Sequence, residues 1–218
     1  MTRRKAAVIA RQEPLRSLLC EGAVADASSG CVSSARYALQ PADLRQPAQV
    51  AAAVAAAGLD PAKPTLVLLE CVLVYLEPES AAGLLGWAAR AFPTSCVLSY
   101  DPTRPDDAFG RQMMLNLRAR GTPFRGIGSA ATPAAAAARL VAAGWERASG
   151  ADMAAVSARL LDPSALRNAE RVEMLDEIEE WTLFQRHYAL ALGVSEGGAA
   201  GLFAGMTLPT TADADKPS

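Results

Sequence analysis

Residues 64–79 read PTLVLLECVLVYLEPE. They begin with the apolar run Leu66-Val67-Leu68-Leu69, which is typical of a strand buried on both faces of a parallel sheet. The run ends in Glu70, and a carboxylate at the end of a buried strand needs a partner because desolvating a lone charge is costly. Ligands of open α/β sheets bind beyond the carboxyl ends of the strands. Glu70 is therefore either a ligand-binding residue or an acid that caps the next turn or pairs with an arginine.

The composition sets broad limits on the class of protein. A chain of 218 residues fits one domain with a sizeable core, although alanine supplies much of the 51% hydrophobic content and buries little area. The formal net charge of −2 gives no indication of binding to nucleic acid or to an acidic membrane surface. No apolar run is long enough to span a bilayer.

Cysteine and histidine give no pattern for a metal site. The four cysteines, at positions 20, 31, 71 and 96, contain no C-x-x-C pair, and His187 is the single histidine, so no bound metal is expected. Cys71 and Cys96 lie in apolar runs and are interpreted as small buried hydrophobic residues. We infer a reducing compartment and expect the protein to be cytoplasmic. One histidine also gives little support for Ser-His-Asp hydrolase chemistry.

Short apolar strands alternate with helical segments along the chain, which predicts a mostly parallel sheet covered by helices. Strands are expected at 35–39, 65–69, 96–100, 145–148 and the second half of 181–194, with a surface loop at 21–34. Helices are expected at 2–11, 48–57, 78–91, 106–120, 132–143 and 152–160, and residues 164–176 form an acidic amphipathic segment. Residues 195–218 predict a disordered tail, leaving 1–194 as the folded domain.

Three carboxylates, Asp43, Glu70 and Asp101, follow predicted strands. If those strands are parallel, the three acids lie on one rim of the sheet, which is a candidate ligand site. The G-x-G at Gly126-Ile127-Gly128 follows a helix-like run and a proline rather than a strand, so it is not interpreted as a nucleotide-binding turn.

Several stretches resemble the leucine carboxyl methyltransferases, which methyl-esterify the C-terminal leucine of the protein phosphatase 2A catalytic subunit. The resemblance covers residues 1–194, and close relatives of the phosphatase-directed members share the same blocks. The matching stretches are SARYALQPADLR (34–45), PTLVLLECVLVYLEPE (64–79), LLGWAARAF (84–92), FGRQMMLNLRARG (109–121), GWERASGADM (144–153) and LDEIEEWTLFQRHYALALG (175–193).

The resemblance implies the α/β, Rossmann-like sheet of S-adenosylmethionine-dependent methyltransferases and a cofactor site. It puts Asp43 and Leu44 at the adenine end of S-adenosyl-L-methionine and Glu70 at the end of the fourth strand, facing the cationic sulfonium and ammonium groups. Tyr75 is a catalytic candidate near the transferred methyl or the leucine tail; the alternative is a half-buried aromatic that braces the loop. The implied partner is the phosphatase C-terminal tail, and a monomer is expected.

The chain departs from the family pattern at its start. Family members first carry a strand and a glycine-rich turn that holds the methionine part of the cofactor, then a second strand, whereas Met1 corresponds to the helix after those strands. The sheet is thus expected to lack its first two strands, leaving the third strand without a ladder partner and the fourth with an exposed edge. The expected function is carboxyl O-methylation with weak cofactor binding; the alternative is a non-catalytic fragment or binding module that keeps the substrate-side surface.

Overall fold

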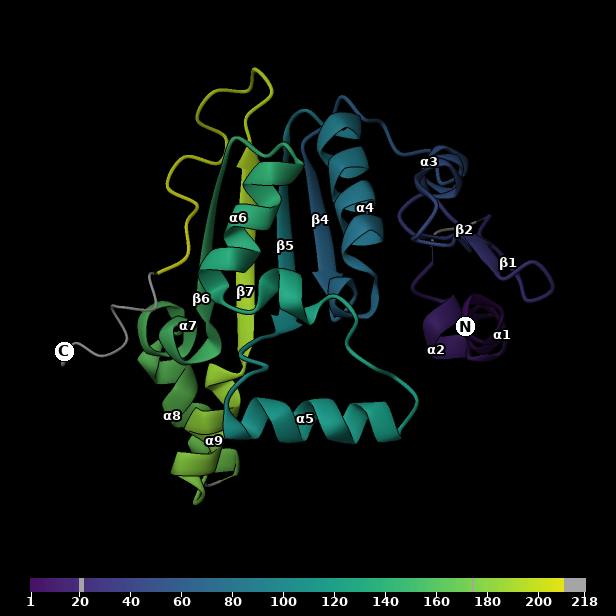
Figure 1. Cartoon of the computed structure of the whole chain (residues 1–218). Helices are drawn as coiled ribbons and strands as arrows, with labels where there is room; N and C mark the ends of the chain where they lie inside the picture. Colours follow the sequence, from purple (N-terminus) through teal and green to yellow (C-terminus); the bar gives the residue numbers. More distant parts are fainter. Residues whose placement is uncertain (20–21, 174, 210–218) are drawn as a thin grey trace. The chain divides into compact units, whose positions relative to one another are not determined.

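The computed structural model describes residues 1–19, 22–173 and 175–209. The chain divides into two compact units, residues 1–60 and 61–218, and Figure 1 labels the elements of both. Among the residues that are described, no helix combines the length and the apolar character needed to cross a membrane.

The first unit contains a small antiparallel sheet with the strand order β1-β2-β3. Its core consists of Ala6, Ile9 and Val32, which pack helix α1 against β2. Gly30, at φ +80, closes the β1–β2 turn, where an added Cβ would lie 2.8 Å from the Arg3 backbone nitrogen. The elements are α1 (Thr2–Arg11), α2 (Glu13–Arg16), β1 (Val24–Asp26), β2 (Cys31–Ser33), β3 (Ala38–Leu39) and α3 (Pro47–Ala56).

Two predictions for this unit are wrong. The segment expected to be a loop, 21–34, contains the paired strands β1 and β2. Each strand has only three residues, and the polar turn residues around them gave no strand pattern in the sequence. The expected strand at 35–39 is reduced to Ala38–Leu39. It does have a ladder partner, since Leu39 pairs with Val32 of β2.

The second unit contains a mixed sheet with the strand order β4-β5-β7-β6. Its strands are β4 (Thr65–Glu70), β5 (Ser95–Pro102), β6 (Arg147–Asp152) and β7 (Tyr188–Ser195). Strand β4 is parallel to β5, while β7 is antiparallel to both β5 and β6. Strands β4, β5 and β6 therefore point the same way, and their carboxyl ends meet at one edge of the sheet.

Helices α4 and α6 lie on one face of this sheet, and α5 crosses beneath the carboxyl ends of β4 and β5 (Figure 1). The expected helices are confirmed, and several starts follow from proline at the first turn or from side-chain caps such as Thr132 and Asp152. The helical elements are η1 (Leu73–Tyr75), α4 (Pro78–Ala91), α5 (Ala108–Ala119), η2 (Ile127–Ala130), α6 (Pro133–Ala143), α7 (Met153–Leu160), α8 (Pro163–Val172) and α9 (Ile178–Arg186).

Strand β4 lies at the edge of the described sheet, and its burial differs from the prediction. Its residues alternate between half-buried and exposed, with Leu66 and Leu68 61% and 59% exposed. The predicted burial on both faces is wrong because β4 pairs only with β5, and successive side chains of a strand point to opposite faces. An unbroken apolar run does not distinguish an edge strand from a central one.

Parts of the segment 196–209 lie against β6 and β7. Leu208 is buried in the cluster formed by Cys96, Val156 and Val194. Arg147 donates hydrogen bonds to the carbonyl oxygens of Phe203 and Met206 at 2.6 and 2.8 Å. Residues 210–218 lie outside the described residues, and the domain limits 1–194 and 195–218 stay a prediction.

Replacing Gly150 by alanine should destabilise the sheet. A Cβ at this position of β6 would lie 2.1 Å from the backbone oxygen of Pro133 at the start of α6, so strand and helix must separate. We expect the free energy of unfolding to fall by about 1–3 kcal/mol in urea denaturation. Gly128→Ala is the control, because its Cβ would meet nothing within 4 Å; equal effects of the two changes would contradict the steric argument.

Candidate functional site

The candidate site lies at the edge where the parallel strands β4 and β5 end. Glu70, the last residue of β4, is exposed and lies directly opposite Tyr100 of β5 in the parallel register. Residues paired in this way direct their side chains to the same face. The sequence prediction that Glu70 ends a strand is confirmed, but the carboxylate is open to solvent rather than buried.

Two stacked tyrosines stand beside Glu70. The rings of Tyr100 and Tyr188 lie 5.2 Å apart at an interplanar angle of 18°. Burial raises the pKa of Tyr100 to about 12, with smaller contributions from Tyr188, Cys71 and Glu70, and burial also raises the pKa of Tyr188, helped by Cys71 and Tyr75. Both phenols therefore keep their protons at neutral pH.

The chain leaves β4 through a tight turn. Cys71 has a left-handed backbone, at φ +48, and its N–H donates to the Tyr100 carbonyl at 2.8 Å. Its thiol is only half-buried, with a pKa raised first by burial, whereas Cys96 is buried as expected. The turn brings Tyr75 to the surface, where its ring meets Phe124 edge-on at 5.3 Å. This geometry is compatible with both interpretations of Tyr75.

A buried ion pair lies behind this turn. Asp101 follows Tyr100 and points to the opposite face, where its Oδ1 accepts the Val74 N–H at 3.3 Å and its Oδ2 lies 3.6 Å from Arg139. The two side chains are only 9% and 10% exposed. Burial raises the pKa of Asp101 to about 6 and lowers that of Arg139, although each partner opposes the other's shift. Asp101 thus holds η1 in place rather than facing a ligand.

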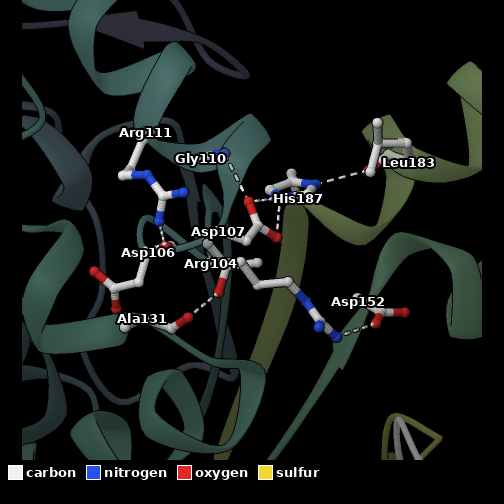
Figure 2. Close-up of polar contacts among 10 residues, drawn as sticks. Arg104, Asp106, Asp107, Gly110, Arg111, Ala131, Asp152, Leu183 and His187 are labelled. Atoms are coloured by element: carbon white, nitrogen blue, oxygen red, sulfur yellow. Dashed lines mark hydrogen bonds and ion pairs between the residues drawn. The ribbon is translucent and has the colours of Figure 1, made fainter.

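A second polar cluster joins the start of α5 to the end of α9 (Figure 2). The ring of His187 is 1% exposed; its Nε2 lies 2.9 Å from both carboxylate oxygens of Asp107, and its Nδ1 lies 2.8 Å from the Leu183 carbonyl. Both ring nitrogens face acceptors, so both hydrogen bonds form only when each nitrogen carries a proton. Asp107 also accepts the Gly110 N–H at 2.8 Å. That bond and His187 lower the pKa of Asp107.

Arg104 lies next to this pair in a strained conformation. Its φ is +54, its N–H donates to the Ala131 carbonyl, and its guanidinium lies 3.3 Å from Asp152 at the end of β6 (Figure 2). The approach of Gly110 is so close that a Cβ there would lie 1.9 Å from the Arg104 oxygen. The sequence analysis did not identify this cluster. The one pattern that could have indicated it is Asp107, because aspartate is a common helix N-cap and Gly110 follows three positions later. His187 caps α9 just before β7.

Asp43 and Leu44 belong to the first unit, and Glu70 belongs to the second. The Asp43 carboxylate accepts from Arg45 at 2.6 Å, and this interaction lowers the pKa of Asp43 to about 2. Leu44 is half-buried in the turn before α3. The structure describes these two residues only within their own unit, so their role at the adenine end of a cofactor stays a prediction. Among the described residues, no group of three or more His, Cys, Asp or Glu could hold a metal ion.

Known proteins are similar to this chain in fold class and in sequence. The fold class is the α/β sheet of the S-adenosylmethionine-dependent methyltransferases. Residues 1–89 match the family model for leucine carboxyl methyltransferase, and the chain is similar to members of this family.

Three relatives illustrate the similarity. The leucine carboxyl methyltransferase 1 homolog of Arabidopsis thaliana is 36% identical over 93% of this chain and 60% of its own length. Leucine carboxyl methyltransferase 1 of Bos taurus is 36% identical over 78% of this chain and 51% of its own length. The tRNA wybutosine-synthesizing protein 4 of Homo sapiens is 42% identical over 78% of this chain and 25% of its own length. The chain thus spans less than two thirds of each.

Replacing Arg139 alone should lower the stability of the fold strongly, whereas replacing both Arg139 and Asp101 should lower it little. Arg139→Met leaves Asp101 buried without its cation, which should lower the free energy of unfolding by about 3–5 kcal/mol. Because a buried carboxyl with a raised pKa favours the protonated folded state, this cost should grow as the pH rises through about 6.

The matched variant is D101L/R139M, which should recover most of the loss because no buried charge remains. Urea denaturation on both sides of pH 6 measures each value. If the double variant is as unstable as Arg139→Met at both pH values, the pair is not the source of the cost.

Asp107→Asn should change how stability depends on pH. The pKa of Asp107 is lowered in the folded state, so its charge stabilises the fold above its unfolded pKa, and this stabilisation is lost as the pH falls through the folded value. The variant should be less stable than wild type at neutral pH and lose less stability in acid. Asp106→Asn is the control, since its backbone carbonyl rather than its carboxylate binds Arg111; parallel pH curves for wild type and Asp107→Asn would refute the prediction.

Proposed function

We propose that this protein is an S-adenosyl-L-methionine-dependent carboxyl O-methyltransferase that acts on the C-terminal leucine of a protein, namely the protein phosphatase 2A catalytic subunit. The similarity to leucine carboxyl methyltransferases supports methyl transfer to a leucine carboxyl group. The observation that carries the cofactor assignment is Glu70, an exposed carboxylate at the carboxyl end of a sheet strand beside stacked aromatic rings.

The residues at this edge fit a cationic methyl donor. The cofactor supplies a methyl group bound to a positively charged sulfur. The Glu70 carboxylate attracts positive charge, and the faces of the nearby tyrosines favour a cation as well. The acceptor carboxylate is already a nucleophile, so the protein has to orient it and exclude water rather than remove a proton. Because Tyr100 and Tyr188 keep their protons at neutral pH, they add no competing negative charge.

Asp43 and Leu44 complete the proposed cofactor contacts at the adenine end, where a carboxylate would accept from the amino group and an apolar side chain would cover the ring. Tyr75, exposed just beyond Glu70, is the proposed neighbour of the transferred methyl or the leucine tail. The protein is proposed to work in the cytoplasm as a monomer.

The second candidate is a non-catalytic binding module that retains the substrate-side surface. Its specific support is the large exposed apolar surface of α9, which includes Ile178 and Trp181. The two candidates differ in one measurable property, since only a methyltransferase binds the methyl donor and transfers its label.

The test is transfer of labelled methyl from S-adenosyl-L-methionine to a peptide that ends in leucine, with the C-terminal amide of the same peptide as a blank. High cofactor concentrations are needed because weak binding is expected. Glu70→Ala should abolish measurable cofactor binding in calorimetry and leave the melting temperature nearly unchanged, because the side chain is exposed and lies at a strand end.

Glu79→Ala, a change to an exposed acid in the first turn of α4, is the matched control and should bind cofactor like wild type. A large drop in melting temperature with unchanged binding would make Glu70 a structural acid. Failure of the wild type to label the peptide, together with retained peptide binding, would favour the binding module.

A further inference from the structure

His187 directly precedes Tyr188, one of the two stacked rings beside Glu70, and its backbone is held on both sides. Its N–H donates to the Phe184 carbonyl of α9 at 3.0 Å, and its own carbonyl accepts the Thr103 N–H at 2.9 Å, just beyond the end of β5. Thr103 is buried, so the second bond lies inside the protein. Two backbone hydrogen bonds therefore set the point from which Tyr188 enters β7.

The side chain of His187 adds a third attachment, which reaches α5 (Figure 2). Its Nε2 lies 2.9 Å from both carboxylate oxygens of Asp107, the N-cap of α5, and its Nδ1 lies 2.8 Å from the Leu183 carbonyl. The imidazole is buried, and the ring of Phe109 lies 4.3 Å from it. Turning the imidazole would leave buried polar groups without partners, which is costly. Its orientation is therefore fixed.

The Tyr188 ring lies between α9 and the candidate methyl-transfer site. It stacks on Phe184 at 4.9 Å and on Tyr100 at 5.2 Å, and Tyr100 lies opposite Glu70. Tyr188 is only half-buried, and Phe184 is exposed. Stacking between such open rings restrains a side chain weakly, whereas the buried contacts of the preceding His187 restrain its backbone firmly.

Asp107 has two roles that a substitution can separate. Its Oδ1 accepts the Gly110 N–H at 2.8 Å, which caps α5, and the same carboxylate holds His187. Serine also caps helices well, but its side chain is shorter and loses the contact with the imidazole. Asp162 provides a matched control, because it caps α8 by accepting the Ser164 N–H at 2.9 Å and the single histidine of the chain lies elsewhere.

We propose that Asp107 and His187 are positioning residues for the candidate methyl-transfer site. They fix the Tyr188 ring, and through it the Tyr100 ring, in the stacked pair whose faces receive the cationic methyl donor beside Glu70. Neither Asp107 nor His187 touches the donor in this assignment. Only the identity of the ligand rests on the proposed function; the placement of the two rings does not.

The first experiment observes the rings by NMR, without ligand, in the whole chain with ring-labelled tyrosine. The four tyrosines, at positions 37, 75, 100 and 188, are assigned with single Tyr→Phe variants. Wild type should show a nuclear Overhauser effect between the rings of Tyr100 and Tyr188. Asp107→Ser should abolish it and leave the signals of Tyr37, in the first unit, unchanged. Asp107→Asn, whose amide can still hydrogen-bond both partners, should keep the effect, and Asp162→Ser should match wild type.

The second experiment measures transfer of labelled methyl to a peptide that ends in leucine. With Asp107→Ser, the KM for S-adenosyl-L-methionine should rise about fivefold, the size expected for a lost contact between a cation and a ring, while kcat changes less. A merely structural role would reduce the fraction of folded protein, and hence the apparent kcat, without changing KM.

The outcomes separate this inference from the proposed function. An undisturbed contact between Tyr100 and Tyr188 in Asp107→Ser would overturn the inference even if methyl transfer is observed. Loss of the contact in Asp107→Asn or in Asp162→Ser would also overturn it, because the loss would then not follow the bond to His187. A lost contact with an unchanged KM would overturn the assignment to the methyl donor. A contact that depends on Asp107 in a protein that transfers no methyl would count against the proposed function and leave the placement of the rings intact.

Discussion

The arrangement of the second unit depends on the pairing of β5 with both of its neighbours. Strand β5 pairs with β7 over eight residue pairs, from Ser95 with Ser195 to Pro102 with Tyr188, and with β4 over six. This register sets Tyr100 level with Glu70 and brings Tyr188 within stacking distance. A slip of one residue would send Tyr100 to the opposite face and expose Asp101 in its place. The composition of the candidate site is therefore a consequence of strand register.

The alternation of side chains along β5 separates two kinds of chemistry. Tyr100 points to the face that carries Glu70, where a charged ligand could bind, whereas Asp101 points into the protein and binds Val74 and Arg139. A buried ion pair is weak evidence for stability, because desolvation offsets much of the attraction. Its effect here is positional: the Asp101 carboxylate holds the turn that leads from Glu70 to Tyr75, while Gly126 donates to the carbonyl of the same Val74.

The features that depend on neighbouring residues in the chain could be predicted from the sequence. Proline at Pro78 and Pro133, the cap at Thr132 and the left-handed Gly144 set the limits of α4 and α6. Glu70 could be placed at a strand end because the apolar run before it stops abruptly.

Features that depend on distant residues could not be predicted. The exposure of Leu66 and Leu68 follows from the position of β4 at the sheet edge, which the run itself does not encode. His187 finds its partner Asp107 eighty positions away, and Leu208 is buried only because β6 and β7 offer it a surface. In each case the contact that decides the structure joins residues far apart in the sequence, which a pattern of neighbouring residues does not reveal.

The pair of His187 and Asp107 joins the start of α5 to the end of α9. Asp107 caps α5 two residues before Phe109, whose ring lies 4.3 Å from the His187 ring, and His187 donates to the Leu183 carbonyl of α9. Helices α5 and α9 are thus both in contact with one buried imidazole. His187 also immediately precedes Tyr188, the ring that stacks on Tyr100 beside Glu70. His187 and Tyr188 thus connect the contacts between α5 and α9 to the stacked rings beside Glu70.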